Sequence, residues 1–116
     1  ELLAAMKNGY PVTVCSTQGF AMERDAEGFC APEGSWGHCM LIGGLRADRP
    51  GACILQSWGP EEPTGPLALD QPSYSFWADK SVIEGMLAQG DSWALAGAPR
   101  FAARALPEHW SYHQAA

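Results

Sequence analysis

Three short apolar runs, set off by glycine and proline residues, constrain the fold of this chain more than any other feature. Residues 11–15 are β-branched and alternating, residues 38–44 end in two glycines, and residues 52–58 form a third run. Such runs between turn formers are typical of strands. A polar connector at 45–51 separates the second run from the third, which predicts an antiparallel hairpin. We therefore expect these three segments to be antiparallel neighbours in one twisted sheet.

Two further segments have helical periodicity. Leu2, Leu3 and Met6 recur at helical spacing, and Gly9 can end that helix. Residues 79–89 carry an apolar stripe of the same period and predict a second helix, outside the sheet.

The remaining segments predict loops and one short strand. Residues 16–37 are rich in Gly, Asp, Glu and Pro and lack a period, so we expect a long loop. Residues 59–75 contain four prolines and predict irregular structure. Residues 92–96 predict a last strand, and the tail from Pro99 is expected to be partly ordered.

Size and composition indicate one folded domain. The chain has 116 residues, of which 47% are hydrophobic, and neither an internal repeat nor a second domain is visible. The expected class is α+β, dominated by an antiparallel β-sheet with short flanking helices. The chain begins at Glu1 rather than Met, which indicates a processed product or a piece of a longer protein.

The charge distribution argues against two classes of partner. The formal net charge is −6, and only seven Lys and Arg residues are spread along the chain. No basic cluster could follow a nucleic-acid backbone, and no polybasic stretch suggests an anionic membrane. We therefore expect no nucleic-acid partner and no membrane partner.

Four cysteines occur, and none forms a CxxC pair; they are Cys15, Cys30, Cys39 and Cys53. This spacing argues against a zinc ribbon or a redox motif. The sequence shows no secretory signal, which argues against a disulfide framework. We expect four reduced thiols, which would suit a cytoplasmic or virion location.

No cofactor and no metal site are expected. His109 and His113 are four residues apart and could hold a metal ion on a helix. Their aromatic and charged neighbours near the end of the chain instead favour a surface tail.

One constellation points to chemistry: His38 is followed eighteen residues later by Gln56, Ser57, Trp58 and Gly59. His38 begins one expected strand and Gln56 lies near the end of the next, so a hairpin would bring them together. The Gln56 amide oxygen could then accept a hydrogen bond from Nδ1–H of His38, which would leave Nε2 for a nucleophile. Trp58 would cover this bond and exclude water.

This pattern resembles the C-terminal half of papain-family (C1) cysteine peptidases. The matching elements are a short helix, a Gly-Pro-Val-like strand at 9–14, a Gly-Phe element at 28–29, a His-led strand at 38–44 and a Ser-Trp-Gly strand end at 57–59. The resemblance covers residues 1 to about 60. It implies a half-barrel-like antiparallel sheet, as in the right-hand domain of the papain fold.

The resemblance also implies roles for residues. His38 and Gln56 would be catalytic, with Trp58 and Ser57 supporting them, although Asn is usual where Gln56 stands. The second substrate subsite would be lined by Cys15, Gly37 and Cys39. The family often has a bridged cysteine near Cys30, and no cysteine follows Cys53 to complete that bridge. The nucleophilic thiol of the family lies on a helix well upstream of this histidine, and no such segment occurs here.

Two function hypotheses remain open. In the first, the chain is the His-bearing part of a cysteine peptidase that acts on peptides or proteins, and its thiol-bearing half lies upstream or on another chain. In the second, it is an inactive papain-like module with a structural or binding role in an assembly such as a virus particle. Either way, we predict that this chain alone hydrolyses no peptide bond.

Overall fold

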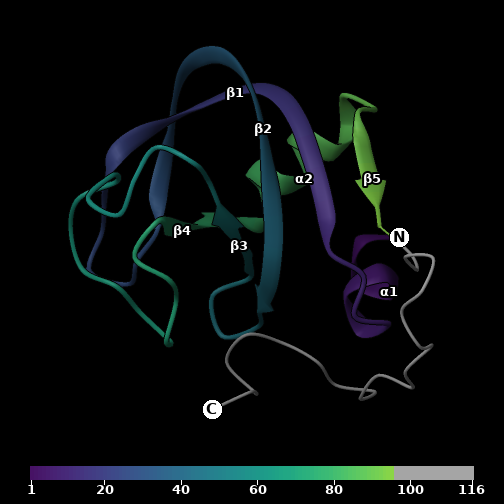
Figure 1. Cartoon of the computed structure of the whole chain (residues 1–116), viewed down its shortest axis with the longest axis horizontal. Helices are drawn as coiled ribbons and strands as arrows, with labels where there is room; N and C mark the ends of the chain where they lie inside the picture. The colour runs from purple at the N-terminus through teal and green to yellow at the C-terminus, as the bar shows by residue number, and fades with distance from the viewer. Residues whose placement is uncertain (96–116) are drawn as a thin grey trace.

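The computed structural model of the protein describes residues 1–95. Its elements are α1 (Leu2–Lys7), β1 (Val12–Arg24), β2 (Cys30–Arg46), β3 (Gly51–Leu55), β4 (Ser75–Asp79), α2 (Lys80–Ala88) and β5 (Ser92–Ala94) (Figure 1). The expected tail from Pro99, with His109 and His113, lies outside the described residues.

The strands of this region form one antiparallel sheet in the order β4-β3-β2-β1-β5. The predicted pairing is confirmed, because β1 pairs with β2 and β2 pairs with β3. Both predicted helices and the predicted last strand also occur, as α1, α2 and β5. The irregular segment between β3 and β4 matches the proline-rich loop expected there.

The prediction of a long loop at 16–37 is wrong, because β1 and β2 extend through it as one long hairpin (Figure 1). Ser16 lies opposite His38, and Phe20 lies opposite Pro32. The register between β1 and β2 shifts three times from the Ser16–His38 pair to the tip of the hairpin. Each shift breaks the two-residue alternation of side chains, so the segment shows no strand period in its sequence.

The sequence analysis also missed β4, which pairs with β3. Ser75, Phe76, Trp77 and Ala78 are all buried, so the strand shows no alternation between apolar and polar residues. Phe76 joins the main hydrophobic cluster on one face of the sheet. Trp77 joins a second cluster with Phe29 on the other face. A strand covered on both faces has no polar side to mark it.

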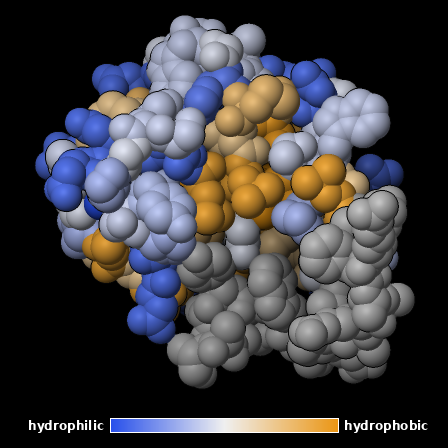
Figure 2. Space-filling view, in the orientation of Figure 1, coloured by the Kyte–Doolittle hydropathy of each residue, from blue (hydrophilic) through white to orange (hydrophobic). Residues whose placement is uncertain are grey.

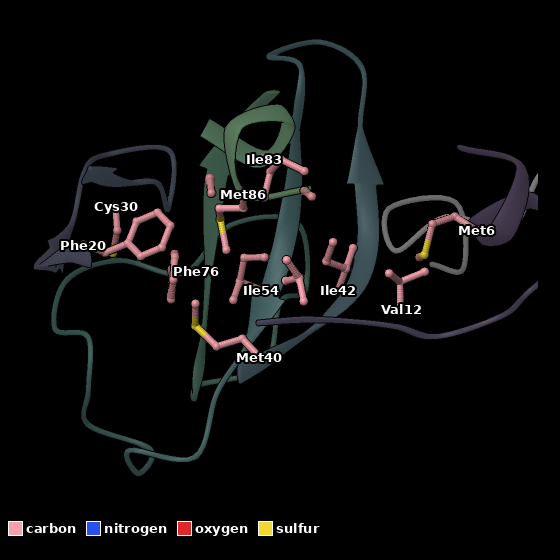
Figure 3. Close-up of a cluster of buried hydrophobic side chains, with 13 residues drawn as sticks. Met6, Val12, Phe20, Cys30, Met40, Ile42, Ile54, Phe76, Ile83 and Met86 are labelled. Atoms are coloured by element: carbon pink, nitrogen blue, oxygen red, sulfur yellow. The ribbon is translucent and has the colours of Figure 1, made fainter. Parts of the chain in front are cut away.

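The main core lies between the sheet and α2. Alternate residues of the strands point toward the helix, and its buried side chains Ile83 and Met86 complete the cluster (Figure 3). The strand residues of this cluster are Val12, Val14, Phe20, Cys30, Met40, Ile42, Ala52, Ile54, Phe76 and Ala78. The periodic stripe of residues 79–89 therefore faces the sheet, as amphipathic helices do.

The fold is mostly β: a five-stranded antiparallel open sheet with two short helices forms a compact globule.

Hydrophobic residues also reach the surface in the middle of the face seen in Figure 2. Trp93 of β5 is 67% exposed and Leu95 just after it is 56% exposed. No helix within residues 1–95 is long and apolar enough to cross a membrane.

Candidate functional site

His38 lies on β2 directly opposite Ser16 of β1 and is half-buried. By strand alternation it points to the same face as Met40, the face that carries the main core. One side of the His38 ring is therefore covered by protein, and the other side is open to solvent.

Two tryptophans hold the His38 ring. Trp58 stacks on it with ring centroids 5.2 Å apart and an interplanar angle of 22°. Trp36 lies 6.0 Å from the His38 ring and meets Trp58 edge-on at 5.1 Å. Trp58 in turn stacks on the buried Phe76 at 6.3 Å, so this aromatic column is anchored in the core. The structure thus brings Trp58 against His38 as predicted.

The predicted hydrogen bond between Gln56 and His38 is absent. Gln56 is buried, and its Nε2 donates to the carbonyl oxygen of Glu62 while its Oε1 accepts from the backbone N–H of Trp58. The amide therefore caps its own loop. These two hydrogen bonds to partly buried backbone groups stabilise the loop, and a contact of the amide with His38 would break them.

The expected roles of the two ring nitrogens of His38 are also wrong. Nε2 is the enclosed nitrogen, and it has no hydrogen-bond partner among residues 1–95. An enclosed atom cannot meet a nucleophile that arrives from solvent. Nδ1 is therefore the nitrogen that can face a nucleophile. A hydrogen-bond acceptor that orients the ring would have to bond Nε2–H instead.

Ser57, the other supporting residue, is exposed on the turn after β3. Its hydroxyl makes no hydrogen bond within the described part of the chain. The structure assigns it no contact with the His38 ring.

An open groove of about 570 Å³ lies beside His38. Cys15, Gly37 and Cys39, the residues expected to bind substrate, all line it together with His38. The other lining residues are Ser16, Thr17, Gln89 and Asp91. The structure therefore brings the expected substrate-binding residues and His38 to one surface.

The sequence analysis missed the groove residues that come from the end of α2. The backbone N–H of Thr17 donates to Oε1 of Gln89 at 2.8 Å, and the N–H of Cys15 donates to the carbonyl of Asp91 at 2.8 Å. No periodic signal links positions more than seventy residues apart. Trp36 was also missed, although its position two residues before His38 would have placed it on the same strand face.

Arg24, also missed by the sequence analysis, anchors the loop between β3 and β4. It is only 6% exposed, and its guanidinium donates to the carbonyls of Gly65, Pro66 and Ser75 at 2.9 to 3.2 Å. Five fixed N–H donors suit this role, since they can reach several carbonyls at once. Arg24 and Gln56 together order the loop that begins with Trp58.

The expectation of four reduced thiols is wrong for Cys15 and Cys39, which form a disulfide. The two residues lie directly opposite each other on β1 and β2. The sequence analysis placed no regular pairing beyond residue 15, so it could not see that these positions coincide. The cytoplasmic or virion location, which was argued from reduced thiols, loses that support.

Cys30 and Cys53 are free and buried. Burial raises the pKa of the Cys30 thiol to about 12 and that of Cys53 to about 11. Both thiols are therefore protonated at neutral pH and are poor nucleophiles. In this structure no cysteine of the chain offers a thiolate beside His38.

No group of three or more His, Cys, Asp or Glu side chains within residues 1–95 lies close enough to hold a metal ion.

Comparisons of the chain with protein-family models, with curated proteins and with solved structures found no match.

Proposed function

We propose that this chain supplies the imidazole side of a papain-like cysteine-peptidase site, with the nucleophilic thiol supplied from outside these 116 residues. The observation that carries the proposal is the placement of His38. Its ring is held by Trp36 and Trp58 at the wall of a groove that Cys15, Gly37 and Cys39 also line. The proposal includes the resemblance of the sheet to the right-hand domain of the papain fold.

In this proposal, His38 exchanges a proton with the incoming thiol through Nδ1, because Nε2 is enclosed. The thiolate attacks the substrate carbonyl, and the imidazolium later returns the proton to the leaving amine. Stacking on Trp58 fixes the plane of the ring. The peptide or protein substrate would lie in the groove, against the strand residues that flank His38.

A second candidate is a papain-like module that binds or builds an assembly without catalysis. The position of the Gln56 amide favours it, since both of its polar atoms bond the loop and Nε2 of His38 finds no acceptor within residues 1–95. An imidazole without an orienting partner spends part of the time in the wrong tautomer.

The purified chain should leave fluorogenic peptides uncut and should not react with an irreversible epoxide inhibitor of cysteine peptidases. Cys30 and Cys53 are buried with raised pKa values, and Cys15 and Cys39 are bonded. Turnover that disappears in His38→Ala would contradict this, because it would show a nucleophile within the chain.

Expressing the chain together with all of the coding sequence that flanks it distinguishes the peptidase function from the binding-module function. The peptidase proposal expects one thiol outside these residues to react with the epoxide. It also expects turnover that is lost in His38→Ala and kept in Met22→Ala, a change at an exposed side chain of β1. Absence of any reactive thiol would support the binding module. Turnover that persists in His38→Ala would overturn the peptidase proposal.

A further inference from the structure

The Cys15–Cys39 disulfide joins two strands at the wall of the groove. The two residues are direct partners in the β1–β2 register, with Cα atoms 4.0 Å apart. The next pair along the strands is Ser16 with His38, and the first register shift follows it. The covalent bond therefore lies where regular strand pairing ends and the groove begins.

The two pairs of cysteines differ in their access to solvent. Cys39 is exposed and Cys15 is half-buried, and both line the groove. Cys30 and Cys53 are 1% and 0% exposed, and burial raises their pKa values. A dissolved thiol can therefore reach the disulfide, and Cys39 is the more exposed of its two residues.

Strand alternation places the disulfide on the opposite face of β2 from His38. Breaking the bond would thus leave the His38 ring and its tryptophan contacts in place. It would remove the covalent tie that holds β1 against β2 beside the ring. The contacts that remain at this point include the backbone pairing, the hydrogen bond from the Ser35 hydroxyl to the carbonyl of Thr17, and the two hydrogen bonds from β1 to Gln89 and Asp91.

We propose that Cys39 is a modification site for low-molecular-weight thiols, and that the Cys15–Cys39 bond is a redox-dependent clamp on the groove. The thiolate of the small molecule attacks Sγ of Cys39 and forms a mixed disulfide. The bond to Cys15 breaks, and the Cys15 thiolate takes a proton from water. A second small thiol then attacks the small-molecule sulfur of the mixed disulfide and releases Cys39 as a thiol. In sum, two small thiols become one small disulfide and the protein disulfide becomes two thiols.

This inference does not depend on the proposed peptidase function, because it concerns the groove whatever occupies it. Native labelling with iodoacetamide, read by peptide mass spectrometry, tests the modification site. Freshly isolated protein should take up no label. After glutathione treatment Cys15 and Cys39 should be labelled or carry glutathione, while Cys30 and Cys53 should react only after denaturation. Labelling of all four thiols before any reduction would overturn the proposal.

Amide hydrogen exchange tests the clamp. We expect dithiothreitol to speed exchange at the backbone N–H of Thr17, which lies two residues beyond Cys15 and donates to Gln89, by about tenfold or more. Exchange at Ile54 in the sheet interior should change much less. The Cys15→Ser/Cys39→Ser double variant should show the fast pattern with or without dithiothreitol, which separates the clamp from other effects of the reagent. Equal exchange at Thr17 in oxidised and reduced protein would overturn the clamp.

Discussion

Cys30 and Cys53 are buried thiols whose chemistry is decided by desolvation. Ionisation would place a negative charge where water cannot solvate it, so the pKa of each thiol rises above the ordinary value of 9.0. Ser75 hydrogen-bonds the Cys53 thiol and partly offsets this rise in its pKa. These two thiols therefore act as small apolar fillers of the core at neutral pH.

The stability of the reduced protein should fall at high pH because of these thiols. Below pH 9 the thiols are protonated in both the folded and the unfolded state, so they leave the free energy of unfolding unchanged. Between pH 9 and about 12 the unfolded thiol of Cys30 ionises while the folded one stays protonated, which favours unfolding. Urea titrations from pH 8 to pH 11 should show a shallower decline in Cys30→Ala than in the parent, both kept reduced to prevent disulfide exchange. Parallel declines would show that this thiol is not desolvated.

Gln56 illustrates how one side chain can suit two roles. Gln56 directly follows β3, where its amide could orient His38. Its side chain also has the length to hydrogen-bond the backbone of Trp58 and Glu62 in the loop that follows. The structure shows the second role. The extra methylene relative to Asn gives Gln the reach to make both loop hydrogen bonds.

The long β1–β2 hairpin is the element that carries the site. It contributes His38 and Trp36 on the core face, and Cys39 on the other face. Its irregular register turns the strands near the groove, as bulges do next to functional sites. The hairpin requires glycine at Gly19 because Trp36 and the carbonyl of Glu33 leave no room there for a Cβ atom.

A methyl group at Gly19 should therefore disturb the hairpin. A Cβ there would lie 2.6 Å from Nε1 of Trp36 and would also clash with the carbonyl of Glu33. We expect Gly19→Ala to lower the free energy of unfolding by about 1–3 kcal/mol and to shift the tryptophan fluorescence. Gly37→Ala is the matched control, since a Cβ at Gly37 meets nothing within 4 Å and should change stability by less than ~0.5 kcal/mol. Similar losses in both variants, measured in guanidinium titrations, would contradict this account.

At the scale of the whole molecule, the strand order assembles the groove from distant parts of the chain. β5 lies on the far side of β1 from β2, so the segment that follows α2 reaches Cys15 and Thr17. The disulfide then ties β1 to β2 across a sequence separation of 24 residues. The groove therefore depends on the segment that follows α2 as well as on the β1–β2 hairpin.

Reduction of Cys15–Cys39 should lower the free energy of unfolding of the whole domain. A cross-link restricts the unfolded chain, and a loop of this length corresponds to a stabilisation of about 3 kcal/mol. Guanidinium titrations with and without dithiothreitol measure the difference. The Cys15→Ser/Cys39→Ser variant should match the reduced parent and should be insensitive to the reductant. An identical midpoint for the oxidised and reduced parent would show that the bond does not constrain the unfolded state.

Local patterns in the sequence determined the regular parts of this protein. Alternation and turn formers place strands near 11–15, 38–44 and 52–58, and helical spacing places α2. These signals depend on neighbouring residues, whose side-chain directions follow from the backbone conformation alone. The expected grouping of Cys15, Gly37 and Cys39 beside His38 came from the resemblance to the papain family and not from these patterns.

Only the tertiary structure decided the partners of individual side chains. The sequence does not reveal three register shifts, so the pairing of Cys15 with Cys39 and the long hairpin between residues 16 and 37 were missed. It also does not reveal that Gln56 caps its loop or that Nε2 of His38 is enclosed. Such contacts form between positions far apart in the chain, where a shift of one residue in register or one change of rotamer selects a different partner.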